Sequence, residues 1–104
     1  MFGIMGTTIT ITRGDTARID VVIKNYTPTE GDRIKFAVKK DYEDETELIT
    51  KYIDPEEMLL EIMPSDTKPL AFGRYVYDME LTTTNGDVDT FIRKAIFNVS
   101  EEVG

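Results

Sequence analysis

A two-residue alternation of side chains between Leu70 and Leu81 constrains the fold more than any other feature of the sequence. After Gly73, successive side chains fall on two different faces. One face is formed by Tyr75, Tyr77, Met79 and Leu81, and the other by Val76, Asp78 and Glu80. This period is that of a β-strand with one face in a core. We therefore predict one long strand over Leu70–Leu81, with the other strands packed around it.

Six other short segments have strand patterns, and turn signals separate them at intervals of about 8–12 residues. They cover residues 7–12, 16–24, 33–40, 48–53, 58–63 and 88–99. The segment 48–53 carries apolar side chains on both faces, so its core face stays open. The segment 58–63 could be a short helix, but its length and the flanking Pro55 and Pro64 favour a strand.

These patterns predict an all-β protein. A length of 104 residues indicates one domain over residues 1–104. We expect an antiparallel two-sheet sandwich of about seven strands. Residues 1–6 are expected to be a flexible arm or a leading edge segment, and residues 100–104 a polar tail. Residues 65–69 form a loop or one helical turn that ends before Pro69.

The dipeptide Asn85-Gly86 is the strongest short signal of a β-hairpin in the chain, because alternating segments flank it. With a two-residue turn at Asn85-Gly86, Asp78 lies opposite Arg93 across the ladder. Opposite charges in such a pair contribute only about 0.2–1 kcal/mol, but they support this register.

The last predicted strand has apolar side chains on both faces. Ile92 and Ile96 share one face, whereas Phe91, Phe97 and Val99 share the other. A bulge near Lys94-Ala95 would bring Ile92 and Phe97 onto one core.

The net charge of −8 is confined to one part of the chain. Residues 41–61 hold nine acidic residues and one base, whereas the other residues hold 11 of each sign. The candidate interface residues are Asp41, Glu43, Asp44, Glu45, Glu47, Glu56 and Glu57. The acidic loop could bind calcium, but it lacks the spacing of an EF-hand loop, so a solvated acidic surface is the simpler interpretation. An acidic chain repels phosphate backbones, so we expect no nucleic-acid partner.

The residue types that are missing exclude several kinds of site. The chain has no Cys, His or Trp, which excludes disulfides, thiolate metal sites, His-based triads and Trp-based sugar stacking. The spacing of the carboxylates fixes no acid–base pair of the glycosidase kind. We therefore expect no catalytic residues, no metal and no cofactor, and a protein that is not an enzyme.

The N-terminal segment shows no basic region followed by a long apolar run, so we expect no signal peptide. No stretch approaches the ~18 apolar residues of a membrane span, so we expect no membrane partner. The tripeptide Arg13-Gly14-Asp15 matches an integrin-binding signal, but Gly14-Asp15 supplies a turn, and a turn is the simpler interpretation.

The run Gly73-Arg-Tyr75-Val-Tyr77 is similar to the Gly-x-Tyr-x-Cys signature of immunoglobulin-like domains, with Tyr77 in the place of the Cys. The resemblance implies that Tyr75 closes a corner through a hydrogen bond to upstream backbone within Pro64–Leu70. The resemblance also implies that the predicted sandwich is immunoglobulin-like. The residues with an expected structural role are Gly73, Tyr75, Tyr77, Asp78, Gly86 and Arg93.

A longer pattern covers nearly the whole chain. It consists of Ile11-Thr-Arg-Gly14-Asp15-Thr16, Ile34-Lys-Phe36-Ala-Val38-Lys, Asp66-Thr67, Leu70 to Glu80, Asn85-Gly86-Asp87, Thr90 and Phe97-Asn-Val99. In order and spacing it resembles small immunoglobulin-like proteins of tailed bacteriophages and prophages, including the N-terminal domain of baseplate upper proteins. The chain is expected to be a stand-alone domain, which departs from that family in having no fibre or receptor-binding tail.

The resemblance implies a virion or tail structural module that is assembled in the bacterial host cytoplasm. Its partners would be other tail or baseplate proteins or further copies of itself, and it would have no catalytic residues. The alternative from the residues is a carbohydrate- or cell-surface-binding module. That alternative would require an exposed, coplanar set of tyrosines.

Overall fold

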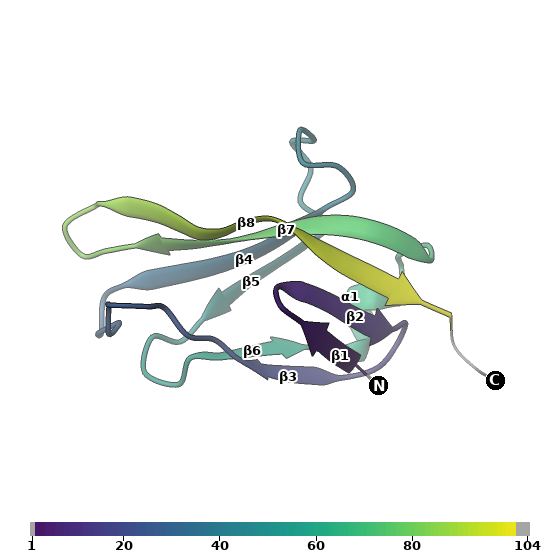
Figure 1. Ribbon diagram of the computed structural model, residues 1–104, viewed down its shortest axis with the longest axis horizontal. Coiled ribbons are helices and arrows are strands. Elements are labelled where there is room, and N and C mark those ends of the chain that lie inside the picture. The colour runs from purple at the N-terminus through teal and green to yellow at the C-terminus, as the bar shows by residue number, and fades with distance from the viewer. Residues whose placement is uncertain (1, 102–104) are drawn as a thin grey trace.

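The computed structural model describes residues 2–101, which form two layers of β-strands (Figure 1). The described elements are β1 (Phe2–Met5), β2 (Thr8–Thr12), β3 (Ala17–Asp20), β4 (Arg33–Lys39), β5 (Ile49–Ile53), β6 (Leu59–Ile62), α1 (Pro64–Thr67), β7 (Gly73–Thr82) and β8 (Val88–Ser100). One layer is a six-stranded sheet in the order β1-β2-β8-β7-β4-β5, and the other is the pair β3-β6. The predicted all-β, two-sheet sandwich is confirmed, with eight strands among the described residues rather than about seven.

The strand order is that of an immunoglobulin-like sandwich. The chain crosses between the layers after β2, β3, β5 and β6, so β3 and β6 pair with each other although β4 and β5 separate them in sequence. β8 pairs with β7 on one side and with β2 on the other, and the pairing with β2 is parallel. This parallel pair brings together two ends of the chain, whereas the other described strand pairs are antiparallel, as predicted.

The inward faces of both layers form one apolar core. The larger sheet contributes Ile9, Ile11, Ile34, Phe36, Val38, Tyr75, Tyr77, Met79, Leu81, Phe97 and Val99, and the smaller sheet contributes Ala17, Ile19, Leu60 and Ile62. The predicted inward face of the 70–81 strand is confirmed. The ring of Tyr77 lies 5.2 Å from that of Phe36, which in turn lies 6.1 Å from that of Phe97, measured between centroids. The three rings therefore pack together on the inner face of the larger sheet.

The segments that the sequence left open are settled by the structure. In β5 the side chains of Ile49 and Ile53 are buried, whereas Tyr52 on the strand and Leu48 just before it are exposed. The segment 58–63 contains a strand, β6, and one helical turn, α1, follows it.

Residues 2–5 form an edge strand, which is the second of the two alternatives expected for residues 1–6, and Met1 lies outside the described residues. β1 pairs with β2 from Phe2↔Ile11 to Met5↔Thr8, which leaves Gly6 and Thr7 as a two-residue loop. Gly6 has φ 62°, the left-handed conformation that such tight hairpin turns require.

The loop between β7 and β8 is longer than predicted. Thr82 pairs with Val88, the Gly86 N–H donates to the Thr83 carbonyl at 2.9 Å, and the Thr83 N–H donates to the Asp87 carbonyl at 2.9 Å. This is a three-residue hairpin loop that ends on Gly86 at φ 88°. The prediction of a two-residue Asn85-Gly86 turn is therefore wrong.

The predicted bulge in the last strand is present, and it changes the partner of Asp78. The register shifts between Tyr77 and Met79, and Lys94 has φ 54°. Asp78 Oδ1 accepts a hydrogen bond from the backbone N–H of Lys94 at 2.8 Å, so this backbone group takes the place that we predicted for the Arg93 side chain. The bulge places Ile92 against the core that contains Phe97, as predicted.

Candidate interaction surfaces

The acidic residues of the β4–β5 connection form a loop that rises from the larger sheet (Figure 1). Asp41, Glu43, Asp44 and Glu45 are exposed. The Asp44 N–H donates to the Asp41 carbonyl at 3.0 Å, and Asp44 Oδ2 accepts from the Asp41 N–H at 3.2 Å. The loop is therefore a closed turn that presents its carboxylates to solvent.

Glu47 belongs to the framework of this loop. Its carboxylate accepts from Lys35 Nζ at 2.8 Å and from the Thr50 hydroxyl at 2.7 Å. These two donors lower the pKa of Glu47, and the same contact raises the pKa of Lys35. Glu47 thus ties the end of the loop to β4, and of the predicted interface residues it is the one whose charge is neutralised nearby.

The loop also contacts β8. The hydroxyl of Tyr42 accepts from Arg93 Nη2 at 3.5 Å, and Lys94 Nζ lies 4.6 Å from the centre of the Tyr42 ring. A shallow recess of about 140 Å³ lies beneath the loop, on the outer face of β4 and β7. Its lining includes Lys35, Lys39, Tyr42, Glu47, Asp78 and Glu80. Two lysines and three carboxylates line this recess, so charges of both signs lie close together in it.

Glu56 and Glu57 lie in the turn between β5 and β6, at the other end of β5 from residues 41–47. Both are exposed, and Asp54 shapes the turn by accepting from the Glu56 N–H at 2.8 Å. Five strand residues at ~3.3 Å each place the two acidic groups roughly 17 Å apart. The structure therefore divides the predicted acidic interface into two patches, one at each end of an edge strand.

Among residues 2–101, no group of three or more acidic side chains is close enough to hold a metal ion. In the same range, no helix is long and apolar enough to cross a membrane. Hydrogen bonds lower the pKa of Asp32 and that of Glu47.

The tyrosines of β7 are structural. The Tyr75 hydroxyl donates to the Ala71 carbonyl at 2.6 Å, which closes the corner before β7, one residue beyond the range predicted for the acceptor. The Tyr77 hydroxyl donates to the Thr7 carbonyl and so fastens the β1–β2 loop to the core. Burial raises the pKa of Tyr77 to about 12. Both rings are buried, so they do not belong to an exposed ligand platform.

Asp32 is a second polar anchor, which we did not predict from the sequence. Its buried carboxylate accepts from the Tyr26 hydroxyl at 2.6 Å, from the Thr29 N–H at 3.0 Å and from the Thr84 N–H at 3.2 Å. The hydroxyl of Tyr26 contributes most to lowering the pKa of Asp32. Asp32 thereby connects the β3–β4 loop to the β7–β8 loop. In the sequence, Asp32 is visible only as an Asp at the end of a turn-rich segment. Its contact with Thr84 spans 52 residues, so local pattern does not indicate it.

The Arg13-Gly14-Asp15 turn is packed against the rest of the domain. The Gly14 N–H donates to the buried Thr67 hydroxyl at 2.8 Å, and the guanidinium of Arg13 lies 4.5 Å from the centre of the Phe72 ring. The predicted interpretation as a turn is confirmed.

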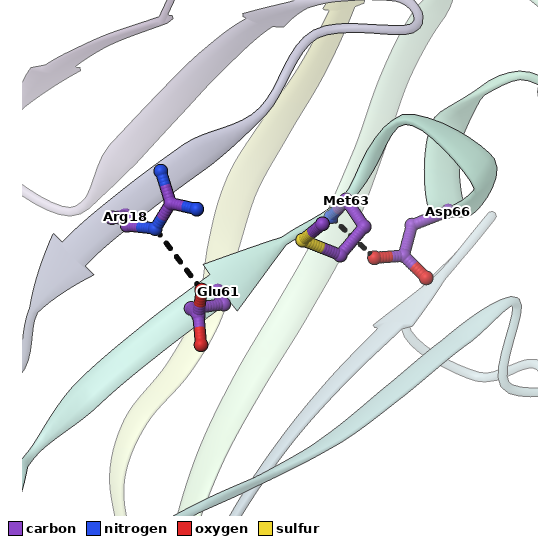
Figure 2. Close-up of polar contacts among 4 residues, drawn as sticks. All are labelled: Arg18, Glu61, Met63 and Asp66. Carbon is purple, nitrogen blue, oxygen red and sulfur yellow. Dashed lines mark hydrogen bonds and ion pairs between the residues drawn. The ribbon is translucent and has the colours of Figure 1, made fainter.

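An ion pair crosses between the two strands of the smaller sheet (Figure 2). Arg18 on β3 pairs with Glu61 on β6 at 3.0 Å, and the two residues are register partners. At the end of β6, Asp66 accepts from the Met63 N–H at 2.7 Å and pairs with Lys51 of β5 at 2.8 Å. The Arg18–Glu61 pair thus joins the two strands of the smaller sheet, and the Asp66–Lys51 pair connects α1 to β5.

β1 differs from every surface described above. It is the outermost strand of the larger sheet at the end opposite to β5, and residues 2–5 contain no charged side chain. Phe2 and Ile4 are 37% and 50% exposed. The sequence signal that could have identified it is the absence of charge from residues 1–12 in a strongly charged chain.

Comparisons with known proteins bear on the fold. No protein-family model matches the chain, and no curated protein matches it. Among solved structures it is similar to the first Ig-like domain of human CD48 antigen, with 15% identity and a TM-score of 0.48 over 100% of this chain and 93% of that one. The strand order and the tyrosine corner, rather than this likeness, identify the chain as an immunoglobulin-like β-sandwich.

Proposed function

We propose that the protein is a non-enzymatic structural module that acts through protein–protein assembly. The observation that carries the proposal is the uncharged β1 edge with its exposed Phe2 and Ile4. An open strand edge can extend its sheet into another chain through backbone hydrogen bonds.

The order of sequence motifs supports a more specific proposal, namely a bacteriophage or prophage virion protein of the tail or baseplate type. The protein would be assembled into particles in the bacterial host cytoplasm. Its partners would be other tail proteins or further copies of itself, with neither nucleic acid nor membrane among them.

The test is incorporation into particles. A C-terminal tag leaves β1 free, and tagged protein is produced in the host while particles form and are then purified on a density gradient. We expect the tagged protein to sediment with tails or whole particles, and the genes beside its own to encode virion proteins. Its absence from purified tails and particles, together with flanking genes of unrelated function, would overturn the proposal.

A further inference from the structure

We propose that β1 is a self-association edge, at which the β1 strands of two copies pair antiparallel and join two six-stranded sheets into one. This inference rests on the proposed assembly function and names the partner as a second copy of the chain. The symmetry is a twofold axis, in which the same strand serves both copies.

The edge is open and regular. β1 pairs with β2 on one side through four consecutive register pairs, and it is the last strand of the sheet on the other side. Natural edge strands are protected by charge, proline or bulges. The run Phe2–Met5 has none of these, and it leaves the side chains of Phe2 and Ile4 partly exposed.

The other edges are protected. β5 carries Lys51, which is paired with Asp66, and an acidic turn lies at each end of the strand. The β3–β6 pair carries Arg18, Asp20 and Glu61. Contacts between copies along β5 would bring two regions of net charge −8 together.

The distribution of charge favours a second copy at β1. A twofold contact requires a surface that is complementary to itself, and an uncharged edge meets this condition whereas a surface of one sign does not. Five strand spacings of ~4.8 Å place β5 roughly 24 Å from β1. This is about three Debye lengths at physiological ionic strength, where the Debye length is ~8 Å, so salt screens the acidic regions of two copies that meet at β1.

An apolar recess adjoins the same edge. Its volume is about 120 Å³, and it lies where β1 and β2 meet β3. The lining includes Ile4, Ile9, Ile19, Val21, Val22 and Ile92. The rim residue Val22 is exposed, so a second copy at β1 would cover apolar surface beyond the strand itself.

The experiment is sedimentation equilibrium of the full chain from micromolar to millimolar concentration. We expect the wild-type chain to show a monomer–dimer equilibrium. The association constant of the dimer should be at least about tenfold lower for Ile4→Lys than for the wild type, and it should be unchanged for Val88→Lys. Val88 is a matched control, because it is an apolar strand residue with 61% exposure at the tip of the β7–β8 hairpin. Circular dichroism establishes that each variant is folded.

Cross-linking gives an independent measurement, because the chain has no cysteine. Under mild oxidation, at least one of the variants Gly3→Cys and Ile4→Cys should form a disulfide-linked dimer, whereas Val88→Cys should not. Antiparallel neighbours bring Cα atoms within about 5.5 Å, which a disulfide can span. A strict monomer at millimolar concentration, or a dimer that Ile4→Lys leaves unchanged, would overturn the proposal.

These outcomes are separate from the test of function. A monomer that still sediments with particles would refute self-association and leave the assembly function supported. A dimer that is absent from particles would support self-association and count against the proposed assembly function.

Discussion

Replacement of Tyr75 tests the corner that starts β7. The side chain is 3% exposed, and its hydroxyl donates to the Ala71 carbonyl at 2.6 Å. Tyr75→Phe removes one hydrogen bond and leaves a carbonyl without this donor, which should lower the free energy of unfolding by about 0.5–1.5 kcal/mol. Tyr75→Ala also removes a buried ring, and we expect a loss of about 2–4 kcal/mol.

Urea denaturation followed by circular dichroism measures both variants, at a concentration low enough for monomer. Each kcal/mol should lower Tm by about 4–8 °C for a domain of this size. Tyr52→Phe is the matched control, since Tyr52 is 62% exposed and should change stability by less than about 0.5 kcal/mol. A loss under about half a kcal/mol for Tyr75→Ala, or equal losses for Tyr75→Phe and Tyr75→Ala, would refute the assignment of the ring to the core.

Three further predictions concern other parts of the domain. Because the pKa of Asp32 is lowered in the folded state, its stabilisation is present above the unfolded value of ~3.9 and is lost as pH falls through the folded value. Asp32→Asn should therefore be less stable than wild type at pH 7 and lose less stability in acid, and parallel acid-melting curves would contradict this. The ultraviolet titration of tyrosine should contain a transition near pH 12 that Tyr77→Phe removes, whereas the raised pKa of Tyr26, which is hydrogen-bonded to Asp32, should be unaffected; an unchanged titration curve would place the buried phenol elsewhere. Gly86→Ala should cost about 1–2 kcal/mol from its φ of 88° alone, because the space around Gly86 is open, whereas Gly3→Ala should be nearly neutral in monomer; equal effects in urea denaturation would exclude a conformational cause.

Local pattern predicted the parts of the fold that local physics decides. The alternation after Gly73 identified the buried face of β7, because side chains on a strand must alternate between two faces. The bulge at Lys94 was predicted because β8 carries apolar side chains on both faces, and only a shift of register brings both sets onto one core. The Gly-x-Tyr signature also predicted the corner at Tyr75, since its hydrogen bond spans only four residues.

Other features depend on contacts that sequence distance hides. A cluster of acids in residues 41–61 suggested one surface, but β5 separates its exposed members into two turns. Asp32 has no visible role until the β7–β8 loop brings Thr84 to it. The strand β1 has a weak pattern with Gly3 inside it, and its order depends on β2 and on the Tyr77 hydroxyl rather than on its own propensity.

The two edges of the larger sheet determine how many copies of the chain the proposed assembly can join. In a dimer joined at β1, the edges of the joined larger sheet that remain open are the two β5 strands, each with an acidic turn at either end. These edges repel further copies of the same chain, so pairing at β1 stops at two rather than continuing as a fibre. A third component would need cationic side chains to dock at β5. Salt therefore distinguishes the two contacts, because dimerisation at the uncharged edge should change little with ionic strength, whereas capture of a cationic partner at β5 should weaken as salt rises.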